Sequence, residues 1–180
     1  MEVKDILYQA ISGYKEQRVL SDIVHGESPA AIRAIYYHCL PELYRFTGIK
    51  SEIRTSFVEG LIHYMLTTAL IPSQRKTSLQ SVEIDIVVPD VKTLASSPQD
   101  AVVISFPKTS ELNDIRENVS KLKKIQPNSN NIWVVLERQV PVDAKVYTLD
   151  KDQFTFANII NDLISFSSNK KQSKLKIFKI

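Results

Sequence analysis

The spacing of apolar residues divides the chain into a helical first part and a mixed second part. Over roughly the first 70 residues, apolar side chains recur every three to four positions, which is the period of one helix face. This spacing predicts helices over about 3–14, 29–46 and 51–70. The break before the second helix reads Gly26-Glu27-Ser28-Pro29, in which the serine is a candidate cap and the proline suits the first helical turn. Residues 1–72 are therefore predicted to form a helical region whose last helix packs on a sheet.

Beyond a polar connector at 73–76, short β-branched runs alternate with amphipathic stretches. The predicted order is strand, strand, helix, strand, strand, helix, which is typical of an α/β domain with a mixed sheet. Strands are expected at about 82–88, 101–106, 132–136 and 145–149, and helices at about 110–125 and 154–166. We therefore predict an α/β core over 73–168, preceded by the helical layer and followed by a basic flexible tail over 169–180.

The charge of the chain is unevenly distributed. Its net charge is +3, but five lysines follow Ser168 without any acid, so the rest of the chain has a net charge of −2. This balance excludes a globally basic nucleic-acid binder, and any basic footprint must be local.

Cysteine use and hydropathy indicate the compartment. Cys39 is the one cysteine, so an intrachain disulfide is excluded, as is common in a reducing interior. The first residues lack the basic-then-apolar order of a signal peptide, and the apolar stretch 61–71 is too short to span a bilayer. We expect a soluble, cytoplasmic protein.

Two of the predicted strands carry candidate chemistry. Because side chains alternate along a strand, Glu83 and Asp85 are expected on one face, as are Phe106 and Lys108 on the second strand. If the strands pair, Glu83, Asp85 and Lys108 share a surface. Carboxylates that hold Mg²⁺ and a lysine that offsets developing charge are what phosphodiester hydrolysis requires. The alternative is an acid that caps or pairs on a solvent-facing side of the strand.

These residues resemble a known family. Glu83-Ile84-Asp85-Ile86-Val87, followed by Val102-Val103-Ile104-Ser105-Phe106-Pro107-Lys108, is similar to the central hairpin of the PD-(D/E)xK nuclease superfamily. That superfamily includes restriction endonucleases and archaeal Holliday-junction resolvases, and the resemblance covers roughly residues 51–150. It implies a restriction-endonuclease-like mixed sheet flanked by helices, Mg²⁺ as cofactor, action on DNA, and a homodimer. It also implies an acid on the preceding helix, for which Glu52 and Glu59 are the candidates.

The sequence departs from the family at one ligand. Where the family has an acid two residues before its lysine, this chain has Phe106, and a phenyl ring cannot coordinate a metal. Glu83 is a candidate substitute from the neighbouring strand. The Pro89-Asp90 pair is an alternative anchor, but it falls past the strand, so Asp85 is favoured. The site is therefore predicted to be degenerate.

The tail carries a second resemblance. Gln172, Leu175 and Phe178 have the spacing of the peptide by which replication and repair proteins dock on the sliding clamp PCNA, although Lys179 stands where a second aromatic is usual. The alternatives are an edge strand, a disordered tail, or a basic tail that touches nucleic-acid phosphates.

Three functions follow. The favoured one is a non-catalytic, nuclease-like accessory protein of DNA replication or repair that binds DNA or a partner such as the clamp. The second is an active, Mg²⁺-dependent, structure-specific endonuclease that uses Asp85, Lys108 and some of Glu83, Glu59 and Glu52. The third is an unrelated α/β protein whose helices mediate oligomerisation.

Overall fold

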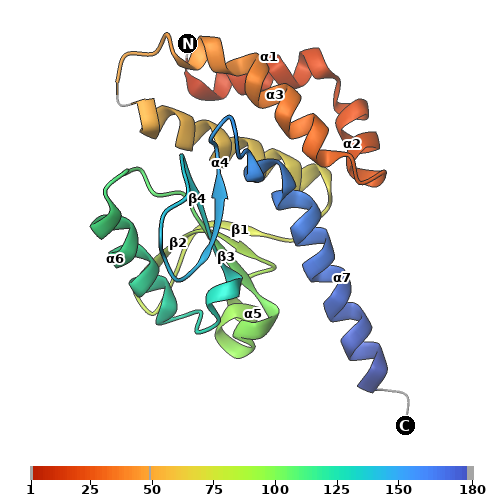
Figure 1. The fold of residues 1–180 in the computed structure, drawn as a ribbon. Helices are drawn as coiled ribbons and strands as arrows, with labels where there is room; N and C mark the ends of the chain where they lie inside the picture. Colours follow the sequence, from red (N-terminus) through yellow and green to blue (C-terminus); the bar gives the residue numbers. More distant parts are fainter. Residues whose placement is uncertain (1, 49, 178–180) are drawn as a thin grey trace.

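A computed structural model describes residues 2–48 and 50–177 of the chain, with side chains as far as residue 169. The chain forms a mixed sheet with helices on both faces (Figure 1). The predicted fold class is confirmed.

The helical layer contains four helices, one more than the apolar spacing predicts. They are α1 (Val3–Tyr14), α2 (Glu16–Val24), α3 (Ser28–Leu43) and α4 (Lys50–Thr68). The short α2 buries only Val19 and Ile23, so its sequence offers little apolar period to recognise. It ends at Val24, and the chain then turns at Gly26, whose φ of +76° is a left-handed conformation that glycine adopts without strain. The residue before α3 is Glu27, and Ser28 lies inside the helix rather than capping it.

The sheet has five strands in the order β1-β2-β3-β4-β5. Strands β1 (Gln74–Leu79), β2 (Val82–Val88) and β3 (Val102–Ser105) are antiparallel neighbours. Strands β4 (Ile132–Leu136) and β5 (Lys145–Thr148) continue the sheet in parallel with β3. The connections contain α5 (Val91–Ser96), η1 (Pro98–Asp100), α6 (Leu112–Lys123) and η2 (Ser129–Asn131).

Strand β1 was predicted as a polar connector, and this prediction is wrong. The strand pairs with β2 through a two-residue turn at Gln80 and Ser81, whose φ angles are +50° and +64°. Two consecutive left-handed residues are typical of the tight hairpin turn that matches the twist of the flanking strands, and that turn is usually written with Asn or Gly. Because β1 is an edge strand with mostly exposed side chains, it lacks the apolar alternation that would reveal it.

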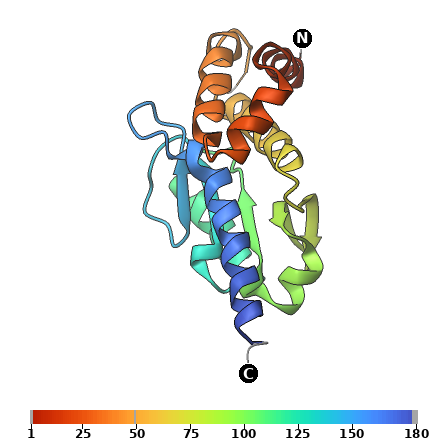
Figure 2. The ribbon, with the colours of Figure 1, turned by 90° about the vertical axis from the view of Figure 1, so that its right-hand side faces the viewer.

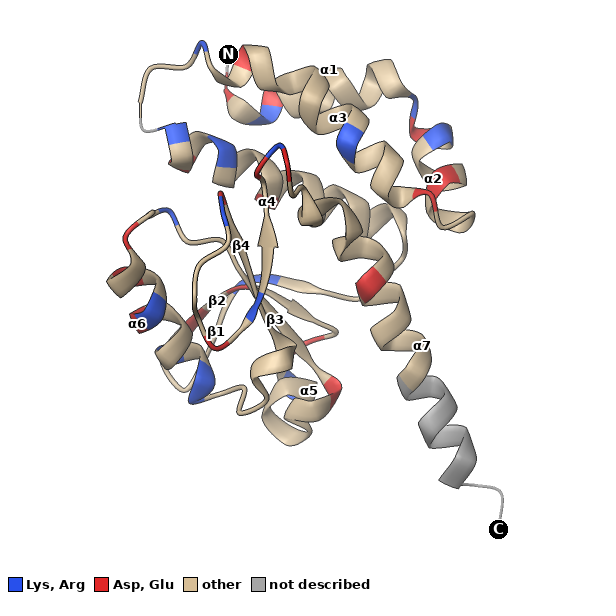
Figure 3. Ribbon diagram, viewed as in Figure 1, with Lys and Arg blue, Asp and Glu red and all other residues tan. Residues whose placement is uncertain are grey.

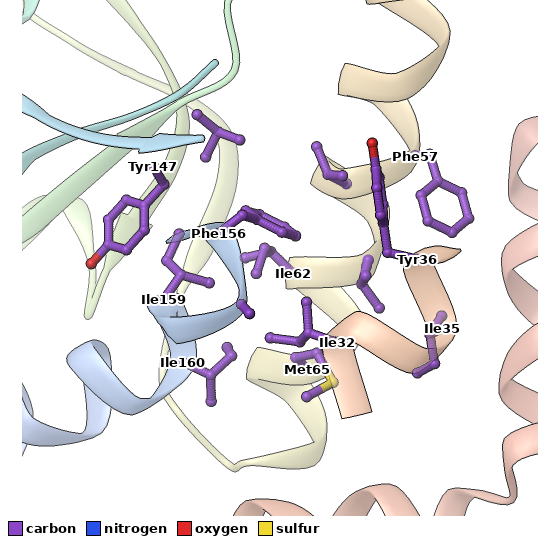
Figure 4. Packing of buried hydrophobic residues seen from close by; sticks show 14 of the residues in the cluster. Ile32, Ile35, Tyr36, Phe57, Ile62, Met65, Tyr147, Phe156, Ile159 and Ile160 are labelled. Carbon is purple, nitrogen blue, oxygen red and sulfur yellow. The ribbon is translucent and has the colours of Figure 1, made fainter. Parts of the chain in front are cut away.

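Apolar clusters lie on both faces of the sheet. One contains residues of α1 to α4 and α7 together with Ile86, Ile104 and Trp133 of the sheet, and Figure 4 shows part of it around Ile32, Ile62 and Met65. The other packs α5 and α6 on the opposite face. Each of these buried faces removes enough apolar surface from water to hold its helices to the sheet.

The C-terminal helix runs further than the predicted end near residue 166. A short 3₁₀ segment, η3 (Thr155–Asn158), leads into α7 (Ile159–Ile177), whose first part crosses the sheet beside α3 and α4 (Figure 2). The clamp-like residues Gln172, Leu175 and Phe178 lie outside the residues whose side chains are described. Within the described part of the chain, none of the helices combines the length and the hydropathy needed to cross a bilayer.

Cys39 tests the packing of the helical layer. Its thiol is 1% exposed on α3, and burial raises its pKa to about 11, so the reactive thiolate is scarce at neutral pH. We expect a thiol reagent such as DTNB to modify the native protein at least a hundredfold more slowly than the protein unfolded in guanidinium. Equal rates in both conditions would show that α3 is not packed against α1 as described.

Candidate functional site

A lysine that the sequence did not single out stands between two of the predicted acids. The Nζ atom of Lys76, on β1, lies 2.7 Å from Oε1 of Glu59 and 2.8 Å from Oδ1 of Asp85. Glu59 comes from α4 and Asp85 from β2, so three elements converge on one ammonium group. Both distances are those of charge-assisted hydrogen bonds.

The backbone is distorted where this contact forms. Register pairs join β1 and β2 on both sides of Lys76 and Asp85, but these two residues are not themselves paired in the ladder. Lys76 has a φ of +46°, a left-handed conformation that costs a non-glycine residue about 1 kcal/mol or more. On β2 the buried face changes across Asp85, because Ile84 belongs to the α6-side cluster and Ile86 to the α4-side cluster. The distortion turns the Lys76 side chain toward both carboxylates.

The second oxygen of Asp85 is held by β3. The backbone N–H of Phe106 donates to Oδ2 of Asp85 at 2.8 Å, and the Ser105 hydroxyl lies 3.5 Å from the same oxygen. The Phe106 ring is buried among the apolar side chains of the α4-side core. Phe106 therefore contributes a backbone donor to the site, while its ring contributes to the core.

The four charges at the junction balance. Nη2 of Arg75 lies 3.3 Å from Oε1 of Glu59, so two cations, Arg75 and Lys76, face two carboxylates, Glu59 and Asp85. We call these residues the charge quartet. Burial lowers the pKa of Lys76, but its hydrogen bonds to Asp85 and Glu59 outweigh this and raise the pKa above its ordinary value. The ammonium is therefore charged throughout the physiological range.

Asp85, Glu83 and Lys108 line one hollow at the end of the β1–β2 hairpin. Its volume is about 760 Å³, and Lys76, Ser105 and Asn118 contribute to the same wall. Asn118, on α6, accepts a hydrogen bond from the Ser105 hydroxyl at 3.0 Å. The three residues predicted to share a surface thus lie around one space, although the lysine that contacts Asp85 is Lys76.

The remaining sequence candidates lie elsewhere. Glu52 is two helical turns before Glu59 on α4 and does not line this hollow. Asp90 caps α5, where its Oδ1 accepts from the Thr93 backbone N–H at 2.7 Å. That backbone hydrogen bond lowers the pKa of Asp90, so the Pro89-Asp90 pair has a structural explanation.

The donor set does not fit the Mg²⁺ that the family resemblance implies. Mg²⁺ requires oxygen ligands in near-octahedral geometry, including one or more free carboxylates. Here both oxygens of Asp85 are engaged, Oε1 of Glu59 faces two cations, and a phenyl ring replaces the third acid. Among the described residues, no three His, Cys, Asp or Glu side chains converge as metal ligands.

Two further hollows continue from this one along the carboxyl ends of β3, β4 and β5. One, of about 280 Å³, shares Pro107 with the first, and the next, of about 490 Å³, shares Glu137 and Arg138 with the second. We call the three together the edge groove. Figure 3 shows that acidic and basic residues are interspersed on the ribbon rather than separated onto different faces. The edge groove therefore has no strong charge of either sign.

The sequence analysis missed Arg75, Lys76 and Asn118. The two basic residues stand in a strand without apolar alternation, and their approach to Glu59 depends on a left-handed residue that no local pattern announces. Asn118 follows Glu117 on an exposed part of α6, where a polar residue is expected anyway. The available signal was that two adjacent basic residues, Arg75 and Lys76, stand in the segment predicted to be a polar connector.

Comparison with known proteins supports the fold. No protein-family model and no curated protein sequence matches the chain. A solved structure of the restriction endonuclease PspGI with substrate DNA is similar, with a TM-score of 0.65 and 12% sequence identity, covering 94% of each chain. At this identity the likeness concerns the fold, which is restriction-endonuclease-like as the resemblance implied.

Replacing Lys76 by methionine tests the charge quartet. The variant leaves Glu59, which is 7% exposed, and Asp85 without their shared cation. Because Lys76 is itself 54% exposed, we expect a loss of only about 1–2 kcal/mol in the free energy of unfolding at pH 7. The raised pKa of Lys76 keeps its contribution complete at neutral pH and removes it only well above pH 10. The deficit should therefore persist from about pH 6 to pH 9, because the ammonium stays charged over this range.

The measurement is urea unfolding of both proteins across this pH range. Lys92→Met, on the exposed side of α5, is the matched control and should change stability little. A Lys76→Met protein as stable as the wild type at pH 7 would contradict the inferred contact.

Proposed function

We propose that this protein is a non-catalytic relative of nucleases that binds DNA along the edge groove and serves DNA replication or repair as an accessory protein. The observation that carries the proposal is the Lys76 ammonium between Glu59 and Asp85. In this interpretation the protein keeps the fold of a nuclease and has replaced the divalent cation by a side chain.

The energetics support the loss of cleavage. For a cation to enter, the Lys76 ammonium must leave two charge-assisted hydrogen bonds, and the cation must then bind without a third carboxylate. The charge quartet is already neutral, so a divalent ion that enters without displacing Lys76 brings uncompensated positive charge into a partly buried space. Lys108 lines the same hollow.

The position of the edge groove supports DNA binding. In open α/β sheets, ligands bind beyond the carboxyl ends of the parallel strands, and the edge groove lies there. Among the described residues, Lys108, Arg138 and Lys151 line it and form no ion pair within 4.0 Å. PspGI, the similar protein, was solved with its substrate DNA. Three unpaired cations are enough for a modest affinity for DNA that depends on contacts with phosphates.

The sequence of the C-terminal tail also supports the proposed accessory role. Gln172, Leu175 and Phe178 keep the spacing of a clamp-docking peptide. A clamp contact supplies the local concentration that a weak DNA binder needs. Homodimerisation, implied by the resemblance to resolvases, belongs to the same proposal and doubles the phosphate contacts.

An active, Mg²⁺-dependent endonuclease is the alternative, and one observation favours it. Two acids and a lysine do converge, as Glu59, Asp85 and Lys76, which is the residue composition that such an enzyme uses. In that case Lys76 would be the catalytic lysine, supplied from β1.

A cleavage assay separates the two functions. We expect the wild-type protein to leave duplex, flapped and four-way-junction DNA intact in Mg²⁺ and in Mn²⁺, because the carboxylates are already occupied by Lys76. Asp85→Asn is the control for a contaminating nuclease. Cleavage by the wild type that disappears in Asp85→Asn would establish the alternative and overturn the non-catalytic assignment.

A binding assay tests the edge groove. Fluorescence anisotropy with labelled DNA should show an affinity that falls with salt at a log–log slope of about −2 to −3, as expected for three phosphate contacts. Lys108→Glu combined with Arg138→Glu should reduce affinity at least tenfold, since both like-charge repulsion and lost contacts act together. Lys92→Glu combined with Lys124→Glu, which changes the net charge by the same amount at two exposed positions outside the edge groove, is the control. An equal effect of the control would mean that the edge groove is not the binding surface.

A further inference from the structure

One end of the edge groove is built differently from the rest. The hollow of about 490 Å³ between α3, α4 and the ends of β4 and β5 is lined by three tyrosines, Tyr36, Tyr37 and Tyr44. Leu40 and Leu149 supply apolar wall, so an aromatic ligand has surface to stack on and to be shielded by. We call this space the tyrosine hollow.

Two donors at the tyrosine hollow have no well-aligned acceptor among the described residues. Tyr36 is 1% exposed; its hydroxyl and the buried Nε of Arg54 lie near each other without a well-aligned hydrogen bond. Figure 4 shows the Tyr36 hydroxyl directed away from Met65. Burial raises the pKa of Tyr36 to about 12, while the nearby Arg54 works in the opposite direction. A buried donor without a partner costs free energy, which a ligand oxygen would recover.

The ligand must therefore combine an aromatic ring with acceptor oxygens. Arg54 already pairs with Glu137, which fixes its guanidinium and leaves Nε directed elsewhere. Arg138 and Lys151 are exposed at the same hollow and suit a phosphate. Tyr44, which is 47% exposed, is the tyrosine most accessible to a stacking ring. These features together describe a nucleotide.

We propose that the tyrosine hollow binds an unpaired nucleotide, with its base against Tyr44 and Tyr37 and its oxygens toward Tyr36, Arg54 and the two exposed cations. Paired bases in duplex DNA are already stacked on their neighbours, so only an unpaired one can enter. The proposal rests on DNA binding along the edge groove and names the DNA structure selected: a duplex that adjoins a single-stranded segment.

The test compares a blunt duplex with the same duplex carrying a short single-stranded overhang, using fluorescence anisotropy and the full chain. We expect the overhang to increase affinity about tenfold, within the range for stacking of a base on an aromatic side chain. Tyr44→Ala should abolish this gain, so that the overhang and blunt duplexes bind the variant with equal affinity. Tyr8→Ala, an exposed tyrosine on α1 outside the edge groove, should keep the gain.

The outcomes separate this proposal from the one it rests on. Blunt-duplex binding without any gain from the overhang would overturn the tyrosine hollow and leave the proposed function standing. Absence of binding to both DNAs would overturn the proposed function; the tyrosine hollow then stands only if a free nucleoside monophosphate binds and Tyr44→Ala abolishes it.

Tyr36→Phe gives a second readout. If the Tyr36 hydroxyl is unsatisfied in the free protein and forms a hydrogen bond only with the bound ligand, its removal should raise the melting temperature of the free protein. The same change should lower the affinity for the overhang DNA. A lower melting temperature with unchanged affinity would show that ordered water satisfies this hydroxyl, and would overturn its assignment as a ligand donor.

Discussion

The ammonium of Lys76 is the contact through which the parts of the candidate site depend on one another. It joins an edge strand, a central strand and the last helix of the N-terminal layer by two short charge-assisted hydrogen bonds. Without this ammonium, Glu59 would keep only its contact with Arg75, and Asp85 would lose its cation. The left-handed backbone at Lys76 is a local cost that these contacts offset.

The scaffold around this contact explains why it is well positioned. Helix α4 is held against the sheet by one apolar cluster, and β2 and β3 are held from the other side by α5 and α6. Helices α4 and α1 approach closely at Gly60, where the Cβ of any larger residue would lie 3.2 Å from a methyl group of Leu7. This close approach lets α4 pack directly against α1. The charged residues occupy positions that the apolar core determines.

Much of the fold could be predicted from the sequence because it depends on the regular spacing of apolar residues. The strands 82–88 and 132–136 and the helices that cover them follow from apolar spacing, and the α/β class follows from their order. The site could be predicted only in part. Asp85 stands out as an acid within an apolar strand, and Glu59 was one of two acids on one helix face. Lys76 could not be predicted, because its position depends on a tight turn without the usual residues and on one unusual φ angle. The role of Phe106 was also hidden, since a backbone N–H is present whatever the side chain is.

The neutrality of the charge quartet has a consequence for how the protein responds to its surroundings. In a nuclease with two or three unpaired carboxylates, the local electrostatic potential changes each time a divalent ion binds or dissociates. Its affinity for DNA therefore depends on the concentration of that ion. Here the compensating charge is covalently part of the chain and cannot be diluted, chelated or exchanged. Under the proposed function, the DNA-binding surface therefore keeps the same charge whatever the concentration of free magnesium, and general ionic screening is what alters it.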